Sequence, residues 1–560
     1  MPTKRTLTRR SFCATAATAA TALAQGTRAA TDDHPVKELS FPSARTYPDP
    51  GNDVVLYVVF IGPGGVEHRV PAFWAGAQSW RVRFAPPMPG QYRYRTIAND
   101  TTNSSLHGKT GSLSVAALAS STNPLYRHGA IRVSADRRHF EHADGTPFFW
   151  LADTWWMGLC NRMRWPEDFQ KLAADRVAKG FSVVQIIAGL YPDMPPFDPR
   201  GRNEAGYPWE KDFSRINPAY FDRADLRIQH LVSRGLAPCI VGCWGYFLPL
   251  MGKARIEQHW RNLIARWGAY PVVWCLAGEG TMPYYLSKTP KEDAAAQKQG
   301  WTDVARYVRA TDPYHRMITI HPSSTARDSV EDASVLDFDM LQTGHGDRTS
   351  LPNTVNRVVE SLQREPKMPV LVGEVCYEGI MEASRQEVQR LMFWTAVLSG
   401  AAGHTYGANG IWQVNTAASP FGPSPHGRNW GTTPWDVAAQ LPGSKMLGVG
   451  KAILARYPWW RFEPHPEWVE PHWNKESYSG PYAAGIPREV RVIFIPPSWN
   501  PPKVARLEAD MAYQATYFDP ATGAMHPAGS AAADANGEWQ APIQPTFADW
   551  VLVLDRRVPS

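Results

Sequence analysis

The chain has 560 residues, of which 44% are hydrophobic and 20% charged, with a formal net charge of +6. These proportions are typical of a soluble globular protein with roughly two to four domains. Four of the positive charges lie in the first 24 residues, and the remaining charge of about +2 argues against nucleic acid or an anionic membrane as a partner.

The N-terminus predicts an export signal. Arg9 and Arg10 precede an apolar Ala/Thr-rich run that ends at Ala22-Leu23-Ala24. A basic segment, a short apolar segment and an Ala-x-Ala cleavage site make up a signal peptide, and paired arginines are typical of the twin-arginine (Tat) pathway. We therefore expect residues 1–24 to be removed and the mature protein to be periplasmic or secreted. No later stretch reaches membrane-spanning length, so no membrane contact is expected after leader removal.

Five cysteines remain after the leader, and their number is odd: Cys160, Cys239, Cys243, Cys275 and Cys376. Three of them lie inside apolar runs that resemble strands, where a cysteine serves as a small buried hydrophobe rather than as a disulfide partner or metal ligand. We expect neither a metal ion nor another cofactor.

Residues 32–118 read as a small N-terminal β-sandwich. Short strands over 54–60, 80–84 and 92–96 are separated by turns rich in glycine and proline. Evenly spaced short strands with such turns favour an antiparallel sandwich.

From about residue 126 the pattern changes to strands that alternate with amphipathic helices, which predicts a (β/α)8 TIM barrel over 126–465. Eight apolar segments occupy 148–153, 181–187, 237–244, 272–279, 317–321, 338–342, 368–374 and 403–407. Asn217-Pro218 is a typical start of a helix, and Ser384-x-x-Glu387 has the pattern of a capping box. Eight such units in about 300 residues are the signature of this α/β barrel, whose active sites lie at the C-terminal ends of the strands.

Strands return in the last part of the chain, over 489–495, 512–518 and 550–554. The segment Asp519-Pro520-Ala521-Thr522-Gly523 provides a turn between two of them. Residues 466–560 therefore read as a second β-sandwich, C-terminal to the barrel.

Two of the barrel strands end in the same dipeptide, Gly278-Glu279 on the fourth and Gly373-Glu374 on the seventh. A buried strand rarely ends on a carboxylate without a need for its charge, and two carboxylates on one barrel rim suit glycoside hydrolysis. We take Glu279 and Glu374 as the candidate catalytic pair. The alternatives are that one is a structural acid paired with an arginine, or that the partner of Glu374 is Asp153 or Glu378.

Aromatic and polar residues at or near strand ends are candidates for substrate binding, because sugars are held by aromatic faces and by hydroxyl contacts. Asp153 suits sugar hydroxyls and equally suits a helix cap. The rim has few cations, which favours a neutral sugar. The full candidate set is Asp153, Trp155, Trp156, Gln185, Trp244, Tyr246, His321, Gln342, His404, Tyr406, Asn409 and Trp412.

Other chemistries lack their motifs. The first barrel strand reads Ala152-Asp153-Thr154-Trp155, without the paired histidines of metal-dependent barrel hydrolases, and His321, His345 and Asp347 do not supply the missing spacing. The chain contains no Gly-x-Ser-x-Gly elbow, P-loop or dinucleotide fingerprint.

Several segments together resemble the apiosidase-like glycoside hydrolases of family 140: FWLADTWW (149–156), the strand 272–279, PVLVGE (369–374) and GHTYGANGIW (403–412). YFDP at 517–520 resembles the collagen-binding-type β-domain that follows such barrels. The resemblance implies Glu279 as acid/base and Glu374 as nucleophile. Relatives often carry Gly-Gly-Asp where this chain has Ala277-Gly278-Glu279.

The sequence thus predicts an exported retaining glycosidase that acts on a plant or bacterial polysaccharide. The competing hypothesis is a non-catalytic carbohydrate-binding or adhesion protein built on a glycosidase scaffold. Retention of both Gly-Glu strand ends argues against this alternative. The sugar, the linkage and the oligomeric state are not predicted.

Overall fold

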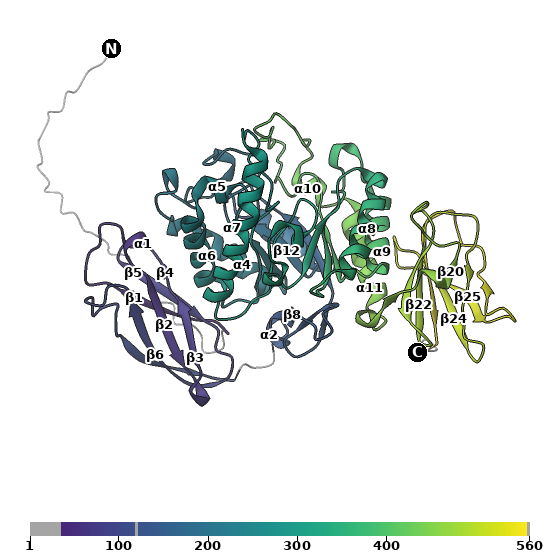
Figure 1. The fold of residues 1–560 in the computed structure, drawn as a ribbon, viewed down its shortest axis with the longest axis horizontal. Helices are drawn as coiled ribbons and strands as arrows, with labels where there is room; N and C mark the ends of the chain where they lie inside the picture. Colours follow the sequence, from purple (N-terminus) through teal and green to yellow (C-terminus); the bar gives the residue numbers. More distant parts are fainter. Residues whose placement is uncertain (1–34, 118–120, 557–560) are drawn as a thin grey trace, which may run out of the picture.

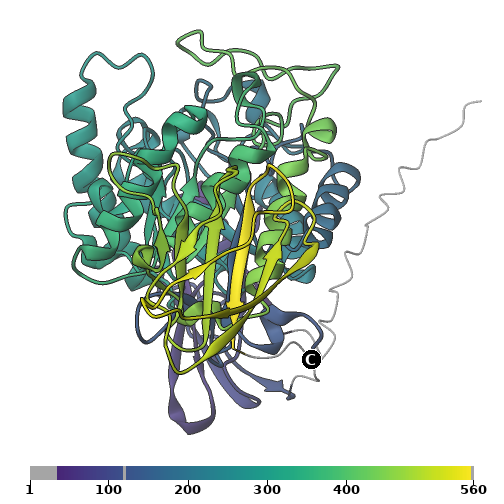
Figure 2. The ribbon, with the colours of Figure 1, turned by 90° about the vertical axis from the view of Figure 1, so that its right-hand side faces the viewer.

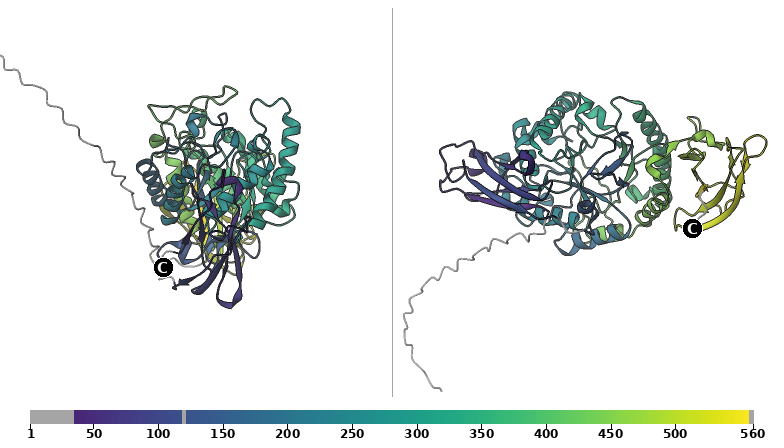
Figure 3. Two further views of the ribbon diagram at one scale, coloured as in Figure 1. Left: turned by 90° about the vertical axis from the view of Figure 1, so that its left-hand side faces the viewer. Right: turned by 90° about the horizontal axis from the view of Figure 1, so that it is seen from below.

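The computed structural model describes residues 35–117 and 121–556. A central barrel carries one β-domain on each of two opposite sides (Figure 1), the purple N-terminal domain and the yellow C-terminal domain. Seen from below, helices form a ring around the central strands (Figure 3). This architecture confirms the predicted α/β barrel with flanking β-sandwiches.

All eight predicted barrel segments form strands, and every pair of neighbours is parallel. The order β15-β14-β13-β12-β11-β18-β17-β16 makes a ring that is interrupted only between β15 and β16. The strands are β11 (Trp150–Trp155), β12 (Val183–Ile187), β13 (Ala237–Val241), β14 (Val273–Cys275), β15 (Ile318–Thr319), β16 (Asp339–Gln342), β17 (Val370–Glu374) and β18 (Gly403–Tyr406). Their apolar runs are buried because helices cover the outer face and side chains fill the interior.

The covering helices have the predicted amphipathic character, as in α6 (Lys253–Trp267), where Ile256, Trp260, Leu263 and Trp267 are fully buried. The fifth unit lacks an α-helix, and short 3-10 turns join β15 to β16. None of the helices in the described part of the chain combines the length and hydropathy needed to cross a bilayer. The main helices are α3 (Glu167–Ala178), α4 (Pro218–Ser233), α6 (Lys253–Trp267), α7 (Pro290–Thr311), α8 (Leu351–Gln363), α9 (Gln386–Leu398) and α11 (Pro442–Leu454), with short α5 (Phe247–Met251) and α10 (Trp435–Ala438).

The two predicted helix starts have different outcomes. The Asn217 side chain accepts a hydrogen bond from the Ala219 amide and caps α4. The prediction of a capping box at Ser384 is wrong, because α9 begins after Arg385 and has no side-chain cap. Ser384 has a positive φ of 53°, and its amide donates instead to Asp347, 37 residues earlier. A tertiary contact has replaced the local one.

A small antiparallel sheet that the sequence did not predict closes the lower end of the barrel. It consists of β8 (Ile131–Val133), β9 (Phe140–His142) and β10 (Pro147–Phe148). Phe140 packs against Trp150 and Phe338, with ring centroids 5.3 and 5.1 Å apart. The opposite end, where the strands terminate, remains the open one.

Two antiparallel sheets form the N-terminal domain. One has the order β1 (Lys37–Pro42), β5 (Ser79–Phe84), β4 (Phe73–Trp74), and the other the order β3 (Glu67–Pro71), β2 (Leu56–Ile61), β6 (Gly90–Ala98), β7 (Thr110–Val115). Arg83 of β5 reaches into the barrel layer, where its guanidinium lies 2.6 Å from Asp225 and donates to the Arg266 carbonyl. Both partners of this ion pair are buried, so truncating either one would leave an uncompensated charge.

The C-terminal domain packs a six-stranded sheet against a three-stranded one (Figure 2). The larger has the order β19 (Glu463–Pro464), β21 (Tyr482–Ile486), β22 (Val490–Ile495), β27 (Trp550–Asp555), β24 (Ala512–Phe518), β25 (Met525–Ala532); the smaller comprises β20 (Val469–Glu470), β23 (Lys503–Val504) and β26 (Trp539–Gln540). Arg390 of α9 binds Asp549 through two hydrogen bonds of 2.7 Å, and Trp394 stacks on Phe494. The five cysteines of the described residues are all buried and unbridged.

Candidate active site

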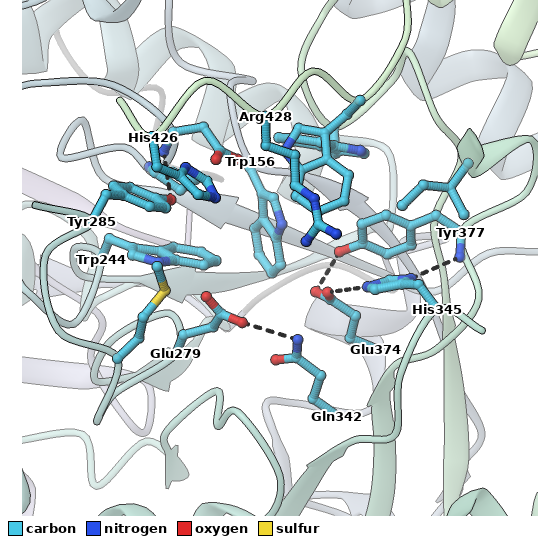
Figure 4. A pocket seen from close by; sticks show the side chains of 16 residues that line it. Trp156, Trp244, Glu279, Tyr285, Gln342, His345, Glu374, Tyr377, His426 and Arg428 are labelled. Carbon is cyan, nitrogen blue, oxygen red and sulfur yellow. Dashed lines mark hydrogen bonds and ion pairs between the residues drawn. The ribbon is translucent and has the colours of Figure 1, made fainter. Parts of the chain in front are cut away.

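A cavity of about 370 Å³ opens at the C-terminal ends of the barrel strands, and both predicted catalytic glutamates lie in it (Figure 4). Its walls are aromatic, with polar groups on the floor. The lining residues are Trp156, Pro192, Asp193, Trp244, Glu279, Met282, Tyr285, Gln342, His345, Glu374, Tyr377, Ile380, Trp412, His426, Arg428 and Trp430.

Glu374 is the last residue of β17, and three side chains hold its carboxylate. His345 Nε2 lies 2.8 Å from Oε1, His321 Nε2 lies 3.2 Å from Oε2, and the Tyr377 hydroxyl donates to Oε2. Burial acts to raise the pKa of Glu374, but the contacts of His321 and His345 outweigh it and lower the pKa below the ordinary value. Glu374 is therefore an oriented anion.

Glu279 lies opposite Glu374 across the cavity, as Figure 4 shows. One of its oxygens, Oε1, accepts a hydrogen bond of 3.0 Å from Gln342 Nε2. Its side chain is partly exposed to the cavity, while the surrounding protein separates it from bulk water. This desolvation, together with the negative charge of Glu374, raises the pKa of Glu279 to about 7.

The two glycines beside Glu279 are required by the close approach of neighbouring groups. A Cβ on Gly278 would lie 2.1 Å from the Trp244 ring, and one on Gly280 would lie 2.4 Å from Ile320. Glu279 itself has a φ of +43°, a left-handed conformation that is costly for a residue with a side chain. The segments that follow β13, β14 and β15 therefore pack tightly around Glu279 and fix the direction in which its side chain points.

The structure brings some of the predicted binding residues into the cavity. Trp156, Trp244, Gln342 and Trp412 line it together with the two glutamates. His321 lies behind Glu374, with its ring against Trp156 at 5.3 Å. Their positions follow from the ends of β11, β13, β15 and β16 and from the loop after β18.

The other predicted binding residues do not line the cavity, and those near the ends of β11 and β18 point outward to the helices. Asp153 binds Arg176 of α3 at 2.6 Å and Trp155 Nε1 at 2.7 Å, so it is neither a sugar contact nor a helix cap. The Trp155 ring packs against Phe169, and His404 packs against Phe393 of α9. Side chains alternate between the two faces of a strand, so residues two positions apart share a face. Asp153 and Trp155 on β11, and His404 on β18, lie on the face that the helices cover.

The remaining corrections concern buried polar residues that lie away from the cavity wall. Gln185 donates to the carbonyl of Gly373 in the barrel interior, and the Tyr246 hydroxyl donates to the Tyr191 carbonyl. The Tyr406 hydroxyl donates to Glu378 Oε2 at 2.5 Å. Asn409 is 2% exposed and is absent from the cavity wall.

Several cavity residues were missed by the sequence reasoning because they come from long loops or follow strand ends by a few positions. Tyr285 and His426 stack at 5.0 Å across two such loops, and Asp193 lies beside them, with its amide donating to the Tyr285 hydroxyl. Arg428 also faces the cavity, which corrects the view of a cation-poor rim. His345 binds Glu374 rather than a metal ion, and its place just after β16 is the sequence signal for this role.

The chemistry that this arrangement supports follows from the two carboxyl groups. One is held ionised and the other has a pKa near neutrality, in a cavity walled by tryptophan. Environments that drive two pKa values apart provide a base or nucleophile and an acid within one site. Among the described residues no cluster of histidine, cysteine and acidic side chains is arranged to hold a metal ion. Fold and site together define a glycoside hydrolase.

Comparison with known proteins names the family. Residues 134–461 match the family model of the apiosidase-like catalytic domain, which is more than half of the chain. This protein belongs to the apiosidase-like family. Residues 33–99 match a second family model, described as a domain of unknown function, DUF5060. The comparison with curated proteins gave no match.

Solved structures share the fold. A protein described as a glycoside hydrolase is 23% identical with a TM-score of 0.64, over 77% of this chain and 98% of its own. A family 5 glycoside hydrolase from Bacteroides vulgatus is 22% identical, also with a TM-score of 0.64, and the match covers 77% of this chain and 93% of that protein. Another Bacteroides vulgatus protein, described provisionally as a glycoside hydrolase, is 17% identical with a TM-score of 0.67, and the match covers 93% of this chain and 98% of that protein.

Proposed function

We propose that this protein is an exported, retaining glycoside hydrolase that cleaves a glycosidic bond in a plant or bacterial polysaccharide. The observation that carries the proposal is the pair Glu279 and Glu374, which share one cavity with pKa values shifted in opposite directions. Glu374 is the nucleophile and Glu279 is the acid/base.

The two steps use these protonation states. The Glu374 carboxylate attacks the anomeric carbon while Glu279 gives its proton to the leaving oxygen, so one carbon–oxygen bond forms as the glycosidic one breaks. Glu279, now ionised, takes a proton from water, and the resulting oxygen displaces Glu374 from the glycosyl-enzyme. His345 and Tyr377 orient Glu374 for both steps through the hydrogen bonds to its two oxygens.

The positions of the other acids support this assignment over the alternatives. Asp153 is paired with Arg176 behind the barrel wall. Glu378 accepts from Tyr406 through Oε2 and from the Gly443 amide through Oε1, and neither acid lines the cavity. A non-catalytic binding protein would have no need for two carboxyl groups with opposed pKa shifts, because each costs free energy to bury.

The assay that tests the function is sugar release from a panel of plant and bacterial polysaccharides, with the first-formed anomer identified by NMR. We expect at least one substrate to be cleaved with retention of configuration. A protein that binds but cleaves no substrate would favour the carbohydrate-binding alternative, and an inverted anomer would refute the retaining mechanism.

The pH dependence of kcat/KM should reflect the two carboxyl groups. Activity requires Glu279 protonated, so it should fall as pH rises through about 7, the pKa that burial and Glu374 give it. Glu374 must be ionised, and because its pKa is lowered, the acidic limb should lie below the ordinary carboxyl range. A pH–rate profile on a neutral substrate checks both limbs, and undiminished activity at pH 9 would contradict the role of Glu279.

Export rests on the twin arginines and the Ala-x-Ala site in residues 1–24, which lie outside the described residues. We expect the exported protein to start after about Ala24. N-terminal sequencing of the protein from the periplasm or medium measures this directly, and retention of Met1 there would disprove it.

A further inference from the structure

Two loops at one end of the C-terminal domain carry the most exposed aromatic side chains of the described residues. Trp499 is 61% exposed and Phe547 56% exposed, their ring centroids lie 5.2 Å apart, and Ile543 is 64% exposed. Trp499 follows β22 and Phe547 precedes β27, and these strands are antiparallel neighbours with Ile495 opposite Trp550. We call these three side chains the C-terminal aromatic patch.

The loops that bear the patch are uncharged and rich in proline, and hydrogen bonds join them at their bases. Residues 496–502 and 541–548 contain no Asp, Glu, Lys or Arg, and six of these fifteen positions are proline. The Ala541 amide donates to the Pro502 carbonyl, and Gln540 Nε2 donates to Pro501 and Pro502. A braced, proline-rich loop loses little conformational entropy when a ligand binds.

The patch lies on the same side of the molecule as the catalytic cavity. Asp549, two residues after Phe547, is bound to Arg390 near the start of α9, and α9 starts at the barrel face where β17 ends in Glu374. The patch and the mouth of the cavity therefore lie toward the same end of the barrel strands.

We propose that the C-terminal aromatic patch is a second carbohydrate-binding site that holds a neutral polysaccharide chain outside the catalytic cavity. Exposed indole and phenyl faces stack on sugar rings, and the exposed side-chain amide of Asn500 beside them suits hydroxyl groups. A polyanion would find no cation in these loops.

A second copy of the chain is a poorer occupant. Aromatic side chains bury roughly 150–250 Å² each, so Trp499, Phe547 and the smaller Ile543, each about three-fifths exposed, supply roughly 450 Å² at most. A stable dimer needs about 800 Å² from each partner. The area suits one or two sugar rings instead.

The test is native affinity electrophoresis in gels that contain xyloglucan, galactomannan or polygalacturonate. We use Glu374→Gln protein to suppress hydrolysis during the run. Retardation of the band measures binding directly, so this readout does not depend on which residues carry out the proposed catalysis. At least one neutral polysaccharide should retard this protein, and adding Trp499→Ala should weaken the apparent affinity about tenfold. Val66→Ala, which removes an equally exposed side chain from the N-terminal domain, should change nothing.

In the otherwise unmodified enzyme, Trp499→Ala should leave kcat/KM on a short soluble oligosaccharide unchanged and lower the rate only on the polymer. The proposal is wrong if neither neutral polysaccharide retards the protein, if polygalacturonate alone does, or if Trp499→Ala migrates like its parent. Size-exclusion chromatography tests whether the patch mediates self-association. A dimer that Trp499→Ala dissociates would assign the patch to that role and overturn the proposal.

Discussion

Glu374→Gln is expected to lower kcat on every substrate by at least about 10⁴-fold, because the amide cannot form the glycosyl-enzyme and no other acid in the cavity has its position. The substitution keeps the size of the side chain and its contact with Tyr377, so the fold should persist. Hydrolysis rates on activated and natural substrates, together with thermal unfolding, measure the two effects separately.

Glu382→Gln is the matched control, because this exposed acid lies in the same segment after β17 and pairs with Arg385 at the surface. It should retain wild-type activity. A Glu374→Gln enzyme with more than a few per cent of wild-type turnover would overturn the assignment of the nucleophile.

Glu279→Ala is expected to show a loss that depends on the leaving group. Removing a general acid costs about 10²–10⁴-fold where the leaving oxygen needs a proton, and much less where the leaving group departs as a stable anion. Natural glycosides should therefore lose activity by roughly 10³-fold, while dinitrophenyl glycosides should form the glycosyl-enzyme at near wild-type rates and accumulate it.

Azide should then accelerate Glu279→Ala, because a small anion needs no base and occupies the space that the carboxylate vacates. The product should be a glycosyl azide of retained configuration, which NMR identifies. Azide should not stimulate the wild-type enzyme. Equal losses on good and poor leaving groups, without azide rescue, would mean that Glu279 only positions the substrate.

The sequence by itself determined the barrel and the two glutamates, because both depend on local patterns. Apolar runs of strand length, separated by amphipathic helices, defined all eight barrel strands. A Gly-Glu dipeptide at a strand end was readable without any tertiary information, and the parallel arrangement of a barrel then brings Glu279 and Glu374 to one face.

Which side chains line the cavity was decided by the tertiary structure. A strand's period of two separates its faces but does not say which one the helices cover, so Asp153 and His404 could not be distinguished from cavity residues. Gln342 meets Glu279 across 63 positions of sequence, and His345 meets Glu374 across 29. The pKa of Glu279 likewise depends on burial and on the charge of Glu374, and both arise only when distant segments pack together.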